Sequence, residues 1–409
     1  MTGSPQAARW GLDPSIDFLN HGSFGACPRD VLEFQAALRD RMEAEPVQFL
    51  WRDLEGLLAG SREALAAFIG ASPDDLAFVT NATTGVNTVL QSLRFGRGDE
   101  LLTTDHEYNA VLNAVRAVAA RDGARVVVAH VPFPIGDPAQ VIASILGVVT
   151  ERTRLALISH VTSPTALIFP AAELIKELTA RGIDTLLDAA HSPGMLPVDL
   201  NAIGAAYATG NAHKWICAPK GSAFLHVRRD RRDRIRPLVV SHGANETQAD
   251  RSRYRAEFDW TGTADPTAAL SIPEALRVVG ELRSGGWPEL MAANRELTLA
   301  ASQLLCEALE IEPPAPPSMI GAMAAFPLPP RFPDDVDIRL FDEHRIEVPV
   351  VGWPVAAALR PGERPRARLL RISAQAYNHR SQYERLADAL RSMSAAPAQR
   401  ASGRIASAE

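Results

Sequence analysis

The sequence predicts an α/β protein, in which a large domain holds a mostly parallel seven-stranded sheet between helices and a smaller α+β domain follows. Two observations support this fold class. From residue 76 to residue 228, short apolar runs alternate with amphipathic stretches, a pattern typical of parallel strands joined by crossover helices. The chain also has 409 residues, more than one compact core usually holds, so at least two domains are expected.

The predicted strands are short and apolar, as expected where both faces of a sheet are covered by helices. Helical periodicity occupies four of the intervals between them. The strands are expected at residues 76–80, 100–104, 125–131, 154–160, 185–188, 205–210 and 222–227, and the helices at residues 84–93, 107–120, 138–149 and 171–181.

The flanking segments complete the predicted fold. Residues 31–69 and 272–309 are predicted to be helical, and residues 319–376 mix short strands with proline-rich turns. Residues 394–409 are largely Ala, Ser, Gly and Arg without an apolar period, so we expect them to be disordered. The predicted division is an N-terminal segment at 1–19, a large domain at 20–270, a small domain at 271–393 and the tail at 394–409.

Composition limits the classes of function. Hydrophobic residues make up 46% and charged residues 22% of the chain, and a net charge of -6 offers no attraction to nucleic acid or to an anionic membrane. No apolar run has the length of a signal peptide or of a membrane span, so a cytoplasmic location is expected. Three scattered cysteines, Cys27, Cys217 and Cys306, suit neither a disulfide framework nor a metal site and are expected to be reduced thiols.

Lysine is scarce in this chain. Only three of the 42 basic residues are lysines, so the other 39 (42 minus 3) are arginines, which cannot supply a deprotonated amine. Lys176 belongs to an amphipathic helix and Lys220 to a Pro-Lys-Gly loop, both ordinary settings. Lys214 instead follows the predicted strand at 205–210, at the sheet edge where open α/β sheets bind ligands. We therefore expect Lys214 to form a Schiff base with a cofactor, the alternative being a solvated surface lysine.

Asp188 ends another predicted strand. A buried carboxylate there is costly unless it is paired with a positive group, and a protonated pyridine nitrogen would be such a partner. The alternative is a structural role in capping the turn that follows. His191, three residues further on, could contact the cofactor's ring oxygen or its imine, or only shape the turn. These two residues and Lys214 predict pyridoxal 5'-phosphate (PLP) as the cofactor.

A phosphate site is predicted where a strand leads into a helix. Asn81-Ala-Thr-Thr-Gly follows the strand at 76–80, so the backbone N–H groups from Ala82 onward and the hydroxyls of Thr83 and Thr84 could bind an anion at the positive end of the helix dipole. Threonine is also a common helix N-cap without any ligand, and that alternative stays open.

Two further positions are candidates for contact with the ligands. His106 follows the strand at 100–104 and could stack on the cofactor ring, a role that Tyr108 could take instead. The alternative is a charged helix start in which the neighbouring Asp and Glu are exposed. Arg371 lies inside an apolar strand of the smaller domain, where it could grip a substrate carboxylate with both arms of the guanidinium, or form a structural ion pair.

These residues carry a resemblance to a known family. Asp188-Ala-Ala-His, Asn211-Ala-His-Lys and Arg371-Ile-Ser, in this order and spacing, resemble the class V aminotransferase family of fold type I PLP enzymes. Within it the chain is similar to the isopenicillin N epimerase-like and cysteine lyase-like branch. The resemblance extends from Leu19-Asn-His-Gly-Ser-Phe-Gly to Tyr377-Asn, and so covers most of the chain.

The resemblance implies a role for each matching residue. Lys214 would bind the cofactor covalently, Asp188 would pair with the pyridine nitrogen and His106 would stack on the ring. Arg371, with Asn20 and His21 from the first motif, would bind the amino-acid substrate. His191 and Ser163 would lie near the ring oxygen, and Thr83, Asn211 and His213 would hold the phosphate. Thr263 would reach the phosphate of a neighbouring subunit, which implies a homodimer.

One departure narrows the expected activity. Related cysteine desulfurases carry a sulfur-accepting cysteine on a mobile loop before the substrate arginine, but residues 347–368 contain none here, which disfavours sulfur delivery by persulfide. Lys214 is expected to remove the α-proton. We rank epimerisation or racemisation first, with His106 or Tyr108 as the second acid, and a C–S β-lyase next. Aminotransferase activity ranks lower, and a PLP-binding protein without catalysis lower still.

Overall fold

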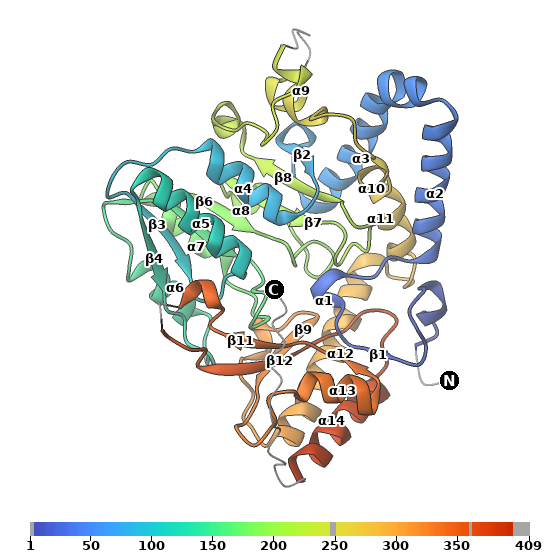
Figure 1. The fold of residues 1–409 in the computed structure, drawn as a ribbon, viewed down its shortest axis with the longest axis vertical. Helices are drawn as coiled ribbons and strands as arrows, with labels where there is room; N and C mark the ends of the chain where they lie inside the picture. The colour runs from blue at the N-terminus through green and yellow to red at the C-terminus, as the bar shows by residue number, and fades with distance from the viewer. Residues whose placement is uncertain (1–3, 246–250, 360–361, 396–409) are drawn as a thin grey trace.

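The computed structural model describes residues 4–245, 251–359 and 362–395. Its centre is a seven-stranded sheet with the order β2-β8-β7-β6-β5-β3-β4 (Figure 1). The strand β8 runs antiparallel to both of its neighbours, and the other six strands share one direction. The prediction of an α/β fold with a mostly parallel seven-stranded sheet is confirmed. The strands are β2 (Leu76–Val79), β3 (Glu100–Thr104), β4 (Arg125–Ala129), β5 (Thr153–Ser159), β6 (Asp184–Asp188), β7 (Tyr207–Asn211) and β8 (Ala223–Val227).

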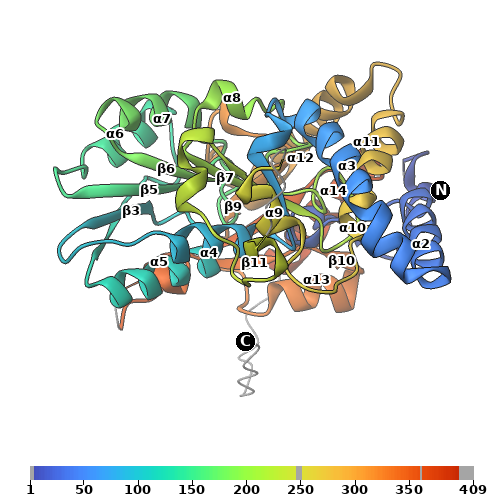
Figure 2. The same ribbon diagram turned by 90° about the horizontal axis from the view of Figure 1, so that it is seen from above.

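Helices cover both faces of this sheet, as Figure 2 shows. On one face lie α4 (Ala82–Ser92) and α5 (Asn109–Asp122), and on the other α6 (Ala139–Leu146), α7 (Ala171–Ala180) and α8 (Leu200–Ile203). Successive side chains of a strand point to opposite faces, so β5 sends Leu155 and Leu157 into one core and Ala156 and Ile158 into the other. Both faces therefore have to be apolar, which is why the strands read as continuous apolar runs.

The strand directions determine where a site can form. The strands β3, β5, β6 and β7 are mutually parallel, and β2 points the same way because two antiparallel steps through β8 restore its direction. Their carboxyl ends thus share one edge of the sheet. The segments that start at Thr80, Asp105, His160, Ala189 and Ala212 all leave from this edge.

The N-terminal helices and those that follow the sheet form a second group at one side of it (Figures 1 and 2). α11 packs against α2 and α3, and α10 packs against the same two helices. The group comprises α2 (Arg29–Ala44), a π-helical segment at Gln48–Asp53, α3 (Leu54–Ile69), α10 (Thr267–Leu270) and α11 (Ile272–Gly280). The single turn α1 (His21–Phe24) precedes this group in the chain, and α9 (Arg253–Asp259) packs against β2 of the large sheet.

The C-terminal part of the chain forms a smaller α+β unit, drawn in orange and red at the bottom of Figure 1. Its antiparallel sheet has the order β11-β12-β9, and the N-terminal strand β1 pairs with β10 of this unit. Its elements are α12 (Gly286–Leu309), β9 (Met323–Pro327), α13 (Val336–His344), β10 (Ile346–Glu347), β11 (Val350–Trp353), β12 (Ala367–Ser373) and α14 (Arg380–Ala395), and β1 is Asp17–Phe18. The predicted domain boundaries stay predictions.

The predicted disordered tail needs one correction. Residues 396–409 lie outside the described part of the chain, but residues 394 and 395 form the last turn of α14. Ser394 accepts a hydrogen bond from Arg331 there, at 2.7 Å. Among the residues that the structure describes, no helix is long and apolar enough to cross a membrane.

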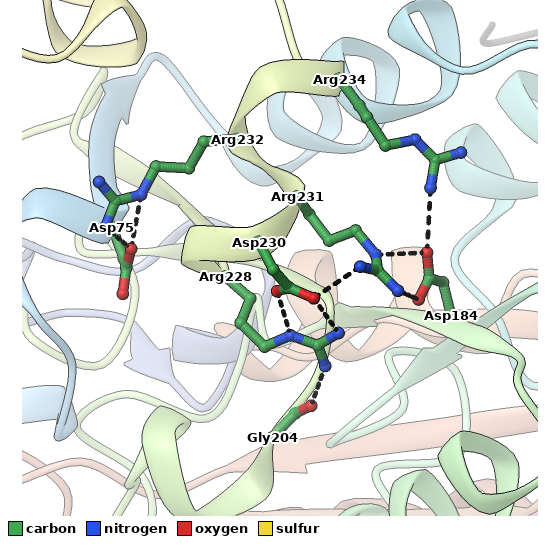
Figure 3. Close-up of polar contacts among 8 residues, drawn as sticks. All are labelled: Asp75, Asp184, Gly204, Arg228, Asp230, Arg231, Arg232 and Arg234. Atoms are coloured by element: carbon green, nitrogen blue, oxygen red, sulfur yellow. Dashed lines mark hydrogen bonds and ion pairs between the residues drawn. The ribbon is translucent and has the colours of Figure 1, made fainter.

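Arginines form ion pairs with carboxylates at the opposite edge of the large sheet (Figure 3). A short 3-10 helix, Arg229–Arg234, follows β8. In it Arg231 donates to both carboxylate oxygens of Asp184, at 2.9 and 3.0 Å, while Arg232 pairs with Asp75. Asp184 begins β6 and Asp75 directly precedes β2, so these pairs hold the amino ends of two strands. Two parallel N–H donors match a carboxylate in a way that a lysine cannot.

Candidate active site

A cavity of about 260 Å³ opens at the carboxyl edge of the large sheet. It lies where the turns after β2, β3, β5, β6 and β7 come together, as the shared strand direction requires. Nine predicted site residues line it: Ala82, Thr83, Tyr108, Ser163, Asp188, His191, Asn211, His213 and Lys214. Ser23, Phe24 and Ser159 are among the other lining residues.

Lys214 lies in the turn after β7, with its Nζ 3.0 Å from His191 Nε2. Burial lowers the pKa of this amine to about 7, and the positive charge of Arg371 acts in the same direction. The turn is packed closely against α1: Gly25 has a φ of +70°, and a Cβ there would lie 2.2 Å from the carbonyl oxygen of His213. Glycine is therefore required at residue 25 to bring the two segments together.

Asp188 ends β6 and is 3% exposed. One carboxylate oxygen accepts a hydrogen bond from the backbone N–H of Ala190, at 2.9 Å. No lysine, arginine or histidine forms an ion pair with this carboxylate within the described ranges. Burial raises the pKa of Asp188, while the Ala190 N–H and the nearby Lys214 oppose that rise. A cationic ring nitrogen is the kind of group that such a carboxylate accommodates.

The turn between β2 and α4 uses two of its backbone N–H groups for hydrogen bonds within the protein. Asn81 caps the helix by accepting from Thr84 N, and Asn211 holds the N–H of Ala82, both at 2.8 Å. Thr83 lines the cavity between them. Thr84 does not line it: its hydroxyl bonds with Thr80, and it lies in a neighbouring pocket. The threonine N-cap alternative is wrong, because Asn81 is the cap.

The structure does not bring His106 to the cavity. Its ring is completely buried, with Nδ1 bonded to Thr165 Oγ1 at 2.7 Å and Nε2 to the carbonyl of Val131 at 3.0 Å. Burial also lowers the pKa of this ring. Because both of its ring nitrogens are bonded within the protein, His106 supports the fold behind the site. Tyr108, two residues later, lines the cavity and is 48% exposed. The predicted alternative of an exposed acidic helix start is also wrong, because Asp105 and Glu107 are buried.

Asn20 and His21 also lie behind the cavity wall. Asn20 donates to Glu347 Oε1 at 3.2 Å, and His21 bonds with the backbone carbonyl of Lys214 at 3.0 Å through Nε2. Both side chains are thus used to join segments of the chain. The same motif still contributes to the cavity through Ser23 and Phe24, at the end of the single turn α1.

Arg371 is a buried cation without an anionic partner. Its guanidinium donates to the carbonyl of Ser163 at 2.6 Å and to the hydroxyl of Ser23 at 2.9 Å, both residues of the cavity wall. Nε has no hydrogen-bond partner, and no carboxylate of the described residues forms an ion pair with this arginine. Burial lowers the pKa of Arg371 to about 10. The alternative of a structural ion pair is therefore wrong, and an anion from outside would satisfy the charge.

Two residues near the cavity were missed by the sequence analysis. Glu107 is fully buried and accepts hydrogen bonds from the N–H and the hydroxyl of Ser159, at 2.7 and 2.6 Å. Burial raises its pKa to about 8, and the nearby Asp188 acts in the same direction. Trp215 donates its indole N–H to His191 Nδ1 at 3.3 Å. Its place directly after Lys214 was a signal, but nothing in the sequence distinguished Glu107 from an exposed helix-start residue.

Some of the remaining positions line the cavity and others lie away from it. Thr263 is exposed and does not line the cavity of its own chain. Two aromatic residues, Phe24 and Tyr108, line the cavity, and Trp260 lines the pocket beside it. Trp353 is buried against His106 instead.

A mostly parallel sheet with a lysine, an unpaired carboxylate and a strand-to-helix turn at one edge defines the class of fold type I PLP enzymes. The sequence profile of the family described as "Aminotransferase class-V" matches residues 49–386. The chain therefore belongs to the class V aminotransferase family of PLP-dependent enzymes, as the sequence motifs predicted.

Curated relatives are of two kinds. The chain is 37% identical over 393 residues to isopenicillin N epimerase of Streptomyces clavuligerus, covering 93% of this chain and 95% of that protein. It is 32% identical over 403 residues to a probable chloroplastic L-cysteine desulfhydrase of Arabidopsis thaliana, covering 92% and 83% of the two proteins. Both branches named by the resemblance are thus present among the relatives.

Solved structures share the fold. A mutant of C-DES with glycine covalently linked to its PLP cofactor superposes with a TM-score of 0.79 at 22% identity, covering 95% of this chain and all of that one. The apo cysteine desulfurase of Thermococcus onnurineus has a TM-score of 0.76 at 19% identity, covering 96% and 99% of the two chains.

Proposed function

We propose that this protein is a PLP-dependent epimerase or racemase that inverts the α-carbon of an amino acid or an amino-acid-derived substrate. The observation that carries the proposal is that two proton-bearing groups, the Lys214 amine and the Tyr108 hydroxyl, line one cavity next to the unpaired cation Arg371. Inversion needs one group to remove the α-proton and a second to return a proton from the other side. The relatives named isopenicillin N epimerase, at 37 and 38% identity, support this choice.

The residues of the cavity suit the cofactor. Lys214 offers the amine that would attach it, and the unpaired Asp188 would face its ring nitrogen. Tyr108, which lines the cavity, would take the stacking position first expected of His106. The cofactor, when bound, supplies an electron sink for the pair left at the α-carbon. Thr83, Asn211 and His213 would hold the phosphate, and His191 and Ser163 would lie near the ring oxygen.

The remaining steps belong to the side chains. Arg371, which donates to Ser163 and Ser23 of the cavity wall, would bind the substrate carboxylate and so fix the α-carbon between Lys214 and Tyr108. With its pKa near 7, the Lys214 amine would take the α-proton at neutral pH. Tyr108 would deliver a proton to the opposite face.

The second candidate is a C–S β-lyase. The relatives named L-cysteine desulfhydrase, at 32 and 33% identity, favour it, and it requires only Lys214 to move protons. Delivery of sulfur through a protein persulfide is disfavoured, because burial raises the pKa of Cys27 to about 12 and of Cys306 to about 11 and also raises that of Cys217. Transamination has less support from the relatives.

Reaction in heavy water separates these functions. Purified enzyme is incubated with isopenicillin N, cysteine and a panel of amino acids, and the products are analysed for deuterium, configuration and keto acids. An epimerase gives α-deuterated substrate of inverted configuration, whereas pyruvate and sulfide from cysteine would replace this proposal by the lyase. In Tyr108→Phe we expect α-deuterium with retained configuration, because exchange through Lys214 continues while inversion is lost.

The role of Lys214 is tested by absorbance. The protein with bound PLP should show the band of a cofactor bound through an imine, and Lys214→Ala should lose it. Lys176→Ala, at an exposed helix position, is the matched control and should keep the band. A band that persists in Lys214→Ala would contradict the proposed role of Lys214 as the residue that binds the cofactor.

We also propose that the protein is a homodimer in which Thr263 reaches the neighbouring site. Thr263 is exposed, and Phe24 and Val240 are 75% and 73% exposed, an unusual degree for apolar side chains. Sedimentation equilibrium should give twice the chain mass. Thr263→Ala in one subunit should weaken PLP binding only at an intact Lys214 site in the other subunit. Mixed dimers in which one subunit carries Lys214→Ala can reveal this.

A further inference from the structure

We propose that Trp215 is a positioning residue: its indole N–H fixes the tautomer of His191, and His191 in turn keeps the Lys214 amine uncharged. The inference rests on the proposed function of Lys214 as the amine that attaches the cofactor and takes the proton. It assigns to Trp215 a part in preparing that amine, and not only a place in the core.

The first step concerns the hydrogen on His191. Trp215 Nε1 lies 3.3 Å from His191 Nδ1, and an indole nitrogen can only donate. Nδ1 must therefore carry a lone pair. Both the charged imidazolium and the neutral Nδ1–H tautomer would place two donors against each other. His191 is thus neutral, with its hydrogen on Nε2.

The second step concerns Lys214. His191 Nε2, which carries the hydrogen, lies 3.0 Å from Lys214 Nζ. An ammonium group has three donors and no acceptor, so it could not receive this hydrogen bond. An uncharged amine can, through its lone pair. The contact therefore selects the uncharged form of Lys214, the form that attacks a carbonyl or removes a proton.

The position of Trp215 makes this arrangement rigid. Its side chain is completely buried, and His191 is 2% exposed. Gly194, with φ at +89°, allows the backbone after His191 to approach Trp215, since a Cβ at residue 194 would lie 2.5 Å from the carbonyl carbon of Trp215. Each of the two hydrogen bonds joins two side chains directly. The indole therefore cannot turn away without repacking the core.

Other charged groups also act on the amine. Burial and the positive Arg371 lower the pKa of Lys214, whereas Asp188 raises it. Burial likewise lowers the pKa of His191, in agreement with a neutral ring. The titratable and charged groups around Nζ are Asp188 on β6, His191 in the turn after it, His213 beside the lysine, His21 on α1 and Arg371 on β12. A test must therefore separate Trp215 from general burial.

Trp215→Phe removes the donor and keeps an aromatic ring. His191 would then be free to carry its hydrogen on Nδ1 and to accept from a charged Lys214 through Nε2. We expect the pKa of the lysine to rise by at least one unit from about 7, which lowers the uncharged fraction of the amine at pH 7 from about one half to about one tenth. The readout is the pH dependence of the rate at which the cofactor-free full chain combines with PLP, followed by absorbance.

Trp10→Phe is the matched control. Trp10 is as buried as Trp215, at 2% exposure, and also donates one indole hydrogen bond, but to the carbonyl of Ala26. It should leave the pH profile unchanged. In a His191→Ala background, Trp215→Phe should have no further effect on the profile. An unchanged profile in folded Trp215→Phe would overturn the proposal.

A second measurement needs no variant. Nitrogen NMR of the cofactor-free protein labelled at histidine reports which ring nitrogen carries the hydrogen. We expect His191 to show the Nε2–H form from pH 6 to pH 8. A charged ring or an Nδ1–H ring would overturn the inference, whichever reaction the enzyme catalyses, and the failure of epimerisation alone would leave it standing.

Discussion

At the scale of single residues, the site is organised around charges that the protein leaves without a partner. Most buried charges of the described chain are paired, as Arg62 is with Asp259 and Glu100 with Arg125. Arg371 and Asp188 are not, although leaving a buried charge unpaired costs several kcal/mol. Such a cost is recovered when a ligand of opposite charge binds, so the two residues mark where an anion and a cation belong.

Arg371→Lys tests this view for the anion. A lysine keeps the charge but loses the planar pair of donors, so we expect kcat/KM to fall about 10- to 100-fold, mainly through KM, in line with about 1.5–3 kcal/mol for a hydrogen bond to a charged group. Arg368→Lys is the control, because Arg368 lies on the same strand but donates to the carbonyls of Phe332 and Pro333. Steady-state kinetics check the result. Equal effects of both substitutions would contradict the assignment.

Glu107 provides a pH-dependent prediction. Its folded pKa of about 8 lies above the ordinary value of 4.5, so the folded protein binds the extra proton between these values. The stabilising contribution of this group is therefore complete below pH 4.5 and is lost as the pH rises through 8. Glu107→Gln keeps a neutral side chain at every pH, so its free energy of unfolding should fall less over this range. Urea denaturation at pH 5, 6.5 and 8 measures the difference, and parallel curves would contradict the prediction.

Sequence reasoning reached some of these residues and not others for a physical reason. Lys214, Asp188 and Arg371 could be found because each places a charge next to an apolar strand, which is visible in one dimension. The choice between His106 and Tyr108 depends on which way a turn points its side chains, and only the folded chain determines that. Glu107 could not be found, because its burial comes from β5 through Ser159, 52 residues away.

At the scale of elements, all seven strands of the large sheet were predicted within a few residues, because both of their faces are buried and their apolar runs are continuous. The antiparallel direction of β8 was not predicted, since an apolar run has no direction. The pairing of β1 with β10 was also missed: two residues, Asp17 and Phe18, carry no period that could predict a strand.

The arginine contacts at the amino edge of the sheet give a prediction at this scale. Arg231→Lys should lose the paired hydrogen bonds to Asp184 and lower the free energy of unfolding by about 1 kcal/mol, a modest figure because the pair is partly exposed. Arg229→Lys, in the same helix and without an ion pair among the described residues, should change it by less than about 0.5 kcal/mol. Urea denaturation checks both. Equal values would mean that the helix is not held through Asp184.

At the scale of the whole molecule, the site joins parts that are far apart in the sequence. The turns of the large sheet provide Lys214 and Thr83, α1 provides Ser23 and Phe24, and β12 provides Arg371. The N-terminal strand β1 is paired within the C-terminal unit, so the start of the described chain is joined to the smaller unit. Relative movement of these units would change the distance from Arg371 to Lys214 directly.

The buried histidines make the whole fold sensitive to acid. Burial lowers the pKa of His160, His213 and His226 to about 4 and that of His21 to about 3, from an ordinary value of 6.5. The folded protein thus binds fewer protons than the unfolded chain, and stability falls as the pH drops from 6.5 toward 4. His226 is the clearest case, because neither ring nitrogen has a hydrogen-bond partner in the described chain.

His226→Leu should therefore make the free energy of unfolding depend less on pH below pH 6.5. One proton difference corresponds to about 1.4 kcal/mol per pH unit, so the slope between pH 6 and pH 4.5 should decrease by up to that amount while stability at pH 8 changes much less. The exposed His344→Leu serves as the control and should keep the slope of the unmodified protein. Urea denaturation at half-unit steps of pH measures the slopes. An unchanged slope in His226→Leu would show that this ring already carries a proton in the folded state.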